Sequence, residues 1–366
     1  MKLFSPFEIK SIKISNRIVR SATYEKMADE DGFVTDKLIN LYVNLAKGGV
    51  GLIITGNVLV HISGRSAPKM LCLHNDFYIE GLKKLTDAVH DEGGKIVIQL
   101  SHGGRQCASI FLHGRQPLAP SAVYEPVYKV TPKEMTQEEI WEIVESFGKA
   151  ARRAKEAGFD GVQIHGAHGY LVNQFLSPYT NRRNDYWGGD EERRFHFLEE
   201  VYNSIRENVG YDYPLMIKLN ASDFIEGGLT LEESLRIAKR LENLGIDAIE
   251  VSGGIVESKP DERPVRPKID SKEKEAYFRE FSKEFKKTIK VPIMLVGGIR
   301  SRSTAEDILE KNEADLISLS RSLIREPDLP KKWEKGKDTA DCIYCNGCMR
   351  FMKLEYVKCT QLEKKR

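Results

Sequence analysis

The feature that most constrains the fold is an eightfold alternation of short apolar runs with longer, charge-rich segments. The apolar runs are rich in Val, Ile and Leu almost throughout, as strands buried on both faces are. These expected strands are residues 16–23, 50–55, 94–100, 159–165, 214–220, 246–252, 291–297 and 314–320. Strands that alternate with helices pair in parallel through right-handed crossovers, so the pattern predicts an α/β fold with a parallel sheet.

The segments between these strands carry amphipathic helical patterns. The expected helices are residues 36–47, 76–92, 137–157, 191–208, 231–243, 272–288 and 302–311. Two of them begin with a capping-box pattern, in which Thr136 and Thr230 are each followed by Glu three residues later. Eight strand–helix units over roughly 330 residues predict a closed (β/α)8 TIM barrel. An open doubly wound sheet is the alternative, but no GxGxxG turn follows the first expected strand.

The regular pattern stops after residue 333, and this divides the chain into two expected parts. Residues 1–335 form the barrel, and residues 336–366 form a short, basic, cysteine-rich C-terminal tail. The tail contains four of the six cysteines, namely Cys342, Cys345, Cys348 and Cys359. Intracellular cysteines with this spacing indicate metal or redox chemistry more than disulfides.

The composition argues against several classes of partner. The 366 residues are 41% hydrophobic and 30% charged, as in ordinary globular proteins. The formal net charge of +2 does not indicate a nucleic-acid or membrane-surface partner. No apolar run is long enough to span a membrane, and the start MKLFSPFEIK lacks the apolar region of a signal peptide. We therefore expect a cytoplasmic protein.

In a TIM barrel the catalytic groups gather at the C-terminal ends of the strands. Gln99 ends the third expected strand, and its amide can donate to and accept from a heterocycle. Lys218 lies in the otherwise apolar fifth strand and needs a negative partner, from a ligand or from the core. The loop VGGIRS after strand seven and Arg321 after strand eight predict a phosphate site. Together these features indicate a nucleotide cofactor without saying which one.

The fourth expected strand ends at His165 and runs into a glycine-rich loop that contains His168 and Tyr170. We expect all three side chains at the barrel mouth. One alternative is that one histidine caps the strand and the other is at the surface. Zinc binding is another, but it needs a third ligand that this stretch lacks. An aldolase that uses Lys218 as a Schiff base, or a barrel that only binds a nucleotide, are further alternatives.

The same residues lie in segments that resemble the Old Yellow Enzyme family of FMN-dependent ene-reductases, over about residues 1–335. The segments, in the order found in the family, are NRIVRSAT, GLIITGN, IQLSHGGR, IHGAHGYLVNQFLSPYTNRRNDYWGG, IKLNASDF, VGGIRS and DLISLSRSLI. The long segment that begins at Ile164 is the most specific of them.

The resemblance implies an FMN site with NAD(P)H as the reductant. The implied FMN-binding residues are Ser21, Ala22, Thr23 and Tyr24 along the flavin, Gly56 and Asn57 near its ring, Gln99 at its pyrimidine part, Lys218 beside its N1–C2 region, and Gly298, Ser320 and Arg321 at the phosphate. Two positions, Tyr24 and Lys26, depart from common family patterns, which leaves the substrate and the redox potential open.

The resemblance also implies the reaction. His165 and His168 would hydrogen-bond the carbonyl or nitro oxygen of an activated alkene and so polarise its double bond. Hydride would pass from the flavin to the β-carbon, and Tyr170 would protonate the α-carbon. NAD(P)H would reduce the flavin in the same pocket, in a ping-pong cycle. A small-molecule substrate and a homo-oligomeric enzyme are expected from the family.

The tail resembles the iron–sulfur segment of trimethylamine dehydrogenase and bacterial 2,4-dienoyl-CoA reductase. Its cysteines follow the pattern Cys342-x2-Cys345-x2-Cys348-x10-Cys359. Four thiolates suit a [4Fe–4S] cluster or a zinc ion, and free thiols are the third option. In those relatives a further flavin and nucleotide-binding region follows, so a cluster here implies an electron-transfer partner or a structural role. The alternative function is an iron–sulfur flavoprotein component of a dienoyl-CoA reductase-like or amine dehydrogenase-like system.

Overall fold

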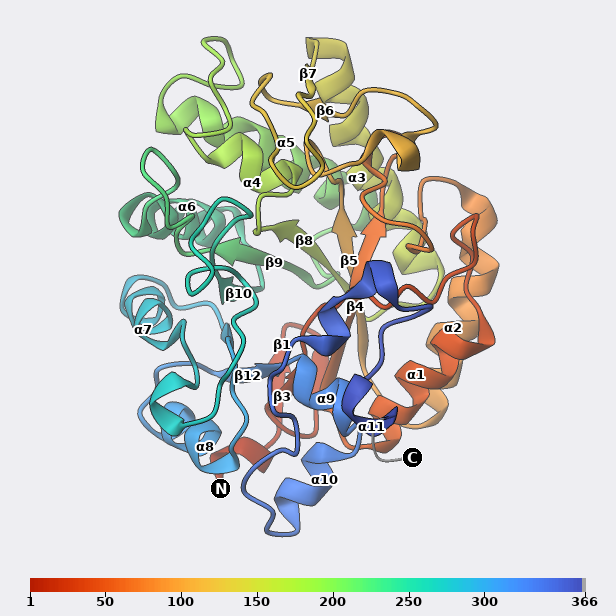
Figure 1. The fold of residues 1–366 in the computed structure, drawn as a ribbon, viewed down its shortest axis with the longest axis vertical. Coiled ribbons are helices and arrows are strands. Elements are labelled where there is room, and N and C mark those ends of the chain that lie inside the picture. The colour runs from red at the N-terminus through yellow and green to blue at the C-terminus, as the bar shows by residue number, and fades with distance from the viewer. Residues whose placement is uncertain (364–366) are drawn as a thin grey trace.

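A closed barrel of parallel strands forms the centre of the computed structural model, which describes residues 1–363 (Figure 1). Its strands are β3 (Ile18–Arg20), β4 (Leu52–Leu59), β5 (Ile96–Ser101), β8 (Gly161–Gly166), β9 (Leu215–Asn220), β10 (Ala248–Ser252), β11 (Ile293–Val296) and β12 (Leu316–Leu319). Neighbouring strands are consecutive around the ring, and β12 pairs with β3 to close it. The (β/α)8 expectation is confirmed, and the open-sheet alternative is excluded.

Amphipathic helices surround the barrel (Figure 1). The long ones are α1 (Asp36–Lys47), α2 (Ile79–Asp91), α3 (Gln137–Glu156), α5 (Glu191–Val209), α6 (Leu231–Leu244), α7 (Arg279–Thr288) and α8 (Arg302–Glu310). Short helices that the sequence patterns did not predict are α4 (Leu171–Leu176), α9 (Arg321–Arg325), α10 (Leu329–Glu334) and α11 (Thr360–Glu363). Both expected capping boxes form, at Thr136 on α3 and at Thr230 on α6.

Two expected elements differ from the structure in an informative way. The first strand is short, because residues after Arg20 leave the barrel and run along a cavity at its mouth. The helix expected over 272–288 is interrupted, and only α7 is α-helical. Ala276 takes a left-handed conformation with φ of 51°, which no α-helix tolerates, and the adjacent Tyr277 N–H donates to Gly297 O at 3.0 Å.

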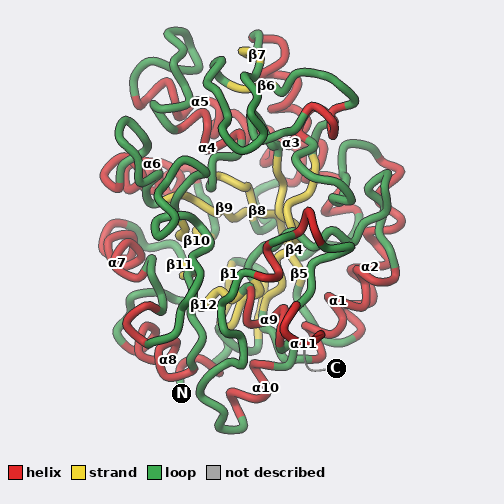
Figure 2. The backbone as a smooth tube through the Cα atoms, viewed as in Figure 1, coloured by secondary structure: helices red, strands yellow, loops and turns green. Residues whose placement is uncertain are grey.

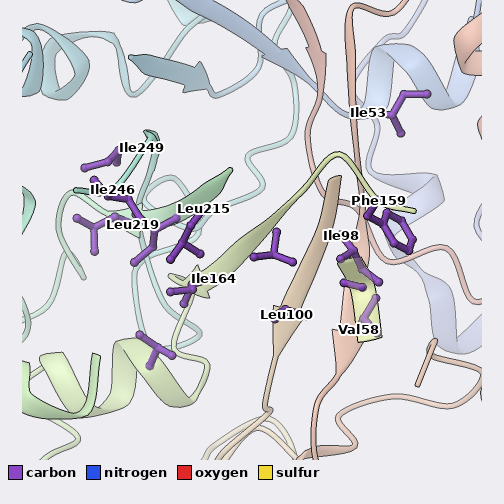
Figure 3. Close-up of a cluster of buried hydrophobic side chains, with 14 of the residues drawn as sticks. Ile53, Val58, Ile98, Leu100, Phe159, Ile164, Leu215, Leu219, Ile246 and Ile249 are labelled. Atoms are coloured by element: carbon purple, nitrogen blue, oxygen red, sulfur yellow. The ribbon is translucent and has the colours of Figure 1, made fainter. Parts of the chain in front are cut away.

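The apolar core has two layers, because side chains along each strand alternate between the inside and outside of the barrel. Outward-facing residues such as Ile53, Ile98 and Ile164 pack with the helices in one large cluster (Figure 3). A second cluster fills the barrel interior near the starts of the strands; it includes Val19, Leu52, Ile54, Val97, Met216, Ala248, Met294 and Leu316.

An antiparallel hairpin of β1 (Phe7–Ile9) and β2 (Ile12–Ile14) joins this inner cluster through Ile9, Ile12 and Ile14. The hairpin therefore closes the end of the barrel at which the strands begin. A second small pair, β6 (Leu118–Ala119) and β7 (Lys133–Glu134), lies in the long connection between β5 and α3.

The C-terminal tail is mostly irregular, and it crosses in front of the barrel strands (Figures 1 and 2). Lys26 and Glu25, which follow β3, hydrogen-bond to the backbone of the tail. The tail therefore packs on the barrel, directly beside the residues that leave the first strand. None of the helices in the described part of the chain is long and apolar enough to span a lipid bilayer.

The hairpin of β1 and β2, which plugs the barrel, predicts a large difference in the free energy of unfolding between two Ile→Ala substitutions. Ile12 is 2% exposed, whereas Ile110 is 80% exposed. We expect Ile12→Ala to lower the free energy of unfolding by about 2–5 kcal/mol, because it leaves a cavity in the inner cluster. Ile110→Ala should change it by less than about 0.5 kcal/mol. Chemical denaturation followed by circular dichroism checks this, and equal midpoints for the two variants would contradict the role of the plug.

Candidate active site

Above the inner apolar cluster, the barrel interior becomes polar. Gln99 donates to Gln163 Oε1 at 2.7 Å, and Gln163 donates to Glu250 Oε2 at 3.1 Å. The same carboxylate oxygen lies 3.2 Å from Lys218 Nζ, which also donates to Ser21 Oγ at 2.9 Å. These buried groups form a continuous hydrogen-bonded chain that crosses the barrel from β5 to the end of β3.

Glu250 is the functional residue that the sequence reasoning missed. It is fully buried on β10, and the strand register puts it opposite Lys218 on β9. The sequence held a signal for it, since a carboxylate in the run IDAIEVS is as unusual as the lysine in PLMIKLN. Lys218 therefore has a negative partner in the core, which is one of the two kinds of partner expected for it from the sequence. Its Nζ is engaged by both Glu250 and Ser21, which does not favour the aldolase alternative.

His165, His168 and Tyr170 converge at the barrel mouth. The His165 ring lies 5.3 Å from the His168 ring and 4.6 Å from the Tyr170 ring, measured between centroids. His168 has a left-handed backbone with φ of 64°, and its N–H donates to Asn220 Oδ1 at 3.0 Å. The hydroxyl of Ser252, at the end of β10, lies 2.7 Å from His168 Nε2 and fixes the ring.

Burial sets the protonation of these three side chains. It lowers the pKa of His168 to about 3, and the charge of Lys218 acts in the same direction. Burial, His168 and Lys218 together hold the pKa of His165 well below its ordinary value. Burial also raises the pKa of Tyr170 to about 12. At neutral pH the site therefore holds two neutral imidazoles and a protonated phenol, all of which can donate a hydrogen bond.

Two adjoining cavities open at this mouth. The first, of about 500 Å³, is lined by Ser21, Ala22, His168, Lys218, Ser252, Pro264, Val265, Tyr277, Val296, Gly298, Ile299, Ser318, Leu319, Ser320, Arg321 and Tyr344. The second, of about 860 Å³, is lined by Ala22, Thr23, Tyr24, Asn57, Ser66, Ala67, Gln99, Tyr128, His165, His168, Tyr170, Lys218, Val265, Ser320, Cys348, Met349, Phe351 and Val357. They share Ala22, His168, Lys218, Val265 and Ser320, and so form one elongated site.

The first cavity has the properties of an anion site. Arg321 lies in its wall over the Tyr344 ring, at 4.3 Å. Its Nη1 donates to two neutral acceptors, Arg266 O at 2.6 Å and Asn346 Oδ1 at 2.5 Å, and no carboxylate of the described residues pairs with it. Gly298 has φ of 73°, and a Cβ there would lie 2.7 Å from the Tyr277 ring, so only glycine fits. Ser318 lines this cavity, and its buried Oγ has no hydrogen-bond partner among the described residues.

Among the expected FMN-binding residues, Gly56 is the one that lines neither cavity. The pairing of β4 with β5 shifts register between Ile54 and Asn57, and this irregularity turns the Gly56 N–H towards Glu25 Oε1, at 2.9 Å. Asn57 then aligns with Gln99, and both line the second cavity. Burial raises the pKa of Glu25, although Tyr42 donates to its carboxylate at 2.5 Å.

The tail cysteines lie around one small cavity of their own, lined by Cys342, Cys345, Cys348 and Cys359 together with Arg321, Ile324, Arg325, Ile343, Tyr344, Asn346, Thr360 and Gln361. Burial raises the pKa of Cys348 to about 11 and also raises the pKa of Cys342. Across residues 1–363, no group of three or more His, Cys, Asp or Glu side chains has an arrangement that could hold a metal ion. This finding supports neither of the two metal options for these four cysteines, a [4Fe–4S] cluster or a zinc ion.

Comparison with known proteins accounts for this arrangement. Residues 2–340 match the model of the NADH:flavin oxidoreductase / NADH oxidase family. The chain is 44% identical to an NADH oxidase of Thermoanaerobacter brockii over 351 residues, which are 95% of this chain and 53% of that protein. The structure of 2-naphthoyl-CoA reductase with 2-naphthoyl-CoA superposes with a TM-score of 0.90 at 32% identity, covering 97% of this chain and 56% of the reductase.

An Old Yellow Enzyme homologue from Zymomonas mobilis superposes with a TM-score of 0.81 at 30% identity, over 99% of this chain and 98% of the homologue. The chain thus spans about half the length of the oxidase and of 2-naphthoyl-CoA reductase, but nearly all of the Zymomonas mobilis homologue. The family match covers the whole barrel and the barrel residues that line the two cavities, and it ends before the tail residues that line them. The chain therefore belongs to the NADH:flavin oxidoreductase / NADH oxidase family, the family of Old Yellow Enzyme.

Proposed function

We propose that the protein is an FMN-dependent oxidoreductase that uses NAD(P)H to reduce activated C=C bonds, as in α,β-unsaturated carbonyl compounds. The observation that carries the proposal is the elongated site, whose anion-binding end leads into a cavity with three neutral hydrogen-bond donors. Such a site suits a phosphorylated cofactor at one end and a polarisable small molecule at the other.

FMN fits the residues that line this site. Arg321, Gly298 and Ser320 would hold the phosphate, and Ser318, whose hydroxyl has no partner among the described residues, lines the same space. Gln99 and Asn57 would bind the polar edge of the ring, with Lys218 at the junction of the cavities. When bound, FMN supplies a carrier that accepts two electrons from NAD(P)H and delivers them to the alkene. NAD(P)H and the alkene would both reach the flavin through the mouth of the barrel, which supports two separate half-reactions.

The histidines would polarise the substrate. Among residues 1–363 the buried Nδ1 of His165 has no hydrogen-bond partner, and Ser252 engages Nε2 of His168, which leaves Nδ1 of His168 for a ligand. Two neutral donors that converge on one oxygen stabilise the negative charge that develops there. Tyr170, whose pKa is raised, keeps its proton at neutral pH and would donate it to the α-carbon.

Replacing a proposed donor tests this role. We expect His168→Ala to lower kcat/KM for 2-cyclohexenone by about 10²–10³, the usual cost of losing one donor at a developing oxyanion. The rate is measured per bound FMN, because His168 also lines the phosphate end. His113→Ala, at an exposed position outside both cavities, is the control. Unchanged enone reduction in a His165→Ala, His168→Ala double variant would rule out the polarising role.

The pKa shifts predict a flat pH profile. With a pKa of about 3, His168 stays neutral above about pH 4, and Tyr170 stays protonated below about pH 11. We therefore expect the second-order rate constant for oxidation of the reduced enzyme by a neutral enone to be constant between about pH 5 and pH 9. Stopped-flow measurements check this. A break near pH 6.5 that His168→Ala removes would show that this histidine titrates in the ordinary range.

A second candidate function is favoured by the common cavity of the four tail cysteines. Four thiols around one cavity match the number of ligands that a [4Fe–4S] cluster takes. In this reading the protein is the flavin component of a larger iron–sulfur reductase or dehydrogenase. The cluster would exchange electrons with a partner.

Iron analysis distinguishes the two candidates. If the tail holds a cluster, protein purified without oxygen contains about four iron atoms and four acid-labile sulfides per chain. Cys345→Ser should remove most of both, whereas Cys72→Ser, at a buried cysteine outside the tail, should retain them. Iron-free protein with normal FMN content would eliminate the second candidate and leave the first intact.

A further inference from the structure

The C-terminal tail forms part of the wall of the second cavity. Four of its residues, Cys348, Met349, Phe351 and Val357, line the same space as the histidines and Tyr170. They are separated by more than 170 residues in the sequence from His165, His168 and Tyr170. The site is therefore completed by a segment that contains no barrel strand.

Lys26 holds this wall in place. Its Nζ donates to Phe351 O at 3.0 Å and to Leu354 O at 2.6 Å, and so joins both ends of the turn that contains Phe351. The adjacent Glu25 O accepts from Val357 N–H at 2.8 Å. Lys26 itself has φ of 56°, and its side chain lines neither cavity. The position that departs from the family pattern therefore binds the tail.

Aromatic side chains gather where the tail and the barrel meet in this cavity, and the tail residues that line it carry no Lys, Arg, Asp or Glu. The Phe351 ring packs edge-on against the Tyr24 ring, with 5.4 Å between centroids and 90° between planes. Tyr128 lines the same cavity. Among the described residues that line this cavity, Lys218 is the one lysine or arginine, and it pairs with Glu250. Such a lining favours neutral, flat, conjugated groups, because aromatic faces and edges attract one another and an unpaired charge would be desolvated.

We propose that Phe351 and Met349 determine substrate specificity, selecting planar aromatic substituents on the carbonyl compound, and that Lys26 is the positioning residue that sets this wall. The inference rests on the proposed function and names its substrate class. Phe351→Ala removes the aromatic wall directly. Lys26→Ala releases the turn without touching the cavity, and Lys26→Arg retains a cationic donor that can hold the same carbonyls.

The first measurement compares two enals with the same reacting group, cinnamaldehyde and crotonaldehyde, on FMN-loaded protein. We expect Phe351→Ala to lower the ratio of their kcat/KM values about tenfold, mainly through KM for cinnamaldehyde. Lys26→Ala should shift the ratio in the same direction, and Lys26→Arg should restore it. Met352→Ala is the matched control, since Met352 is the neighbour of Phe351 but is 64% exposed and lines neither cavity.

The second measurement needs no alkene reduction. Calorimetry gives the Kd of the FMN-loaded protein for acetophenone and for 2-butanone, an aromatic and an aliphatic ketone. We expect Phe351→Ala and Lys26→Ala to weaken acetophenone binding about tenfold and to leave 2-butanone binding unchanged. If neither enal is reduced but acetophenone binding still depends on Phe351, the proposed reaction is wrong and the specificity role of Phe351 is retained. Equal aromatic preference in the wild type and in Phe351→Ala overturns the inference.

Discussion

The buried ion pair between Lys218 and Glu250 is the interaction on which the rest of the site depends. The two charges face each other across β9 and β10, with the amides of Gln163 and Gln99 continuing the chain. Charges this deep are tolerated only when they are paired and hydrogen-bonded, and breaking such a pair costs about 3–5 kcal/mol. The pair thus places a positive group at the floor of both cavities without leaving the barrel interior with a net charge. Burial keeps His165 and His168 neutral, and Lys218 acts in the same direction because a nearby cation disfavours a second one.

The position of this polar chain follows from the layering of the barrel. Below it, the inner apolar cluster and the N-terminal hairpin exclude water from one end. Above it, the strand ends supply Ser252 and Asn220, which fix the ring and the backbone of His168. The left-handed conformation of His168 is stabilised by that backbone hydrogen bond. A rigid support on strands therefore orients donors that themselves lie in a loop.

Much of this could be predicted from the sequence, because the information was local. The periodicity of each strand and the two capping boxes predicted the barrel, and the glycine-rich loops indicated the anion site. The register shift in β4, which separates Gly56 from Asn57, leaves no local pattern. Glu250 was visible but was not connected with Lys218, since that pairing depends on strand register. The role of Met349 and Phe351 depends on where an irregular tail folds back, and irregular segments carry no periodicity to read.

The division of the second cavity between barrel and tail has a consequence for how such a site can diversify. His165, Gln99 and Lys218 lie on strands whose other side chains belong to the packed core, and the loop with His168 and Tyr170 is supported by those strands, so a change there disturbs the barrel. The facing wall belongs to a surface segment attached through main-chain atoms, by Lys26 and Glu25. Tyr344 and Asn346 anchor the tail through their side chains, but the hydrogen bonds from Lys26 and Glu25 do not depend on which side chains the turn at Phe351 carries. The residues of this turn can therefore change without loss of its attachment. Selection can thus alter which molecules the site accepts while the chemistry beneath stays constant.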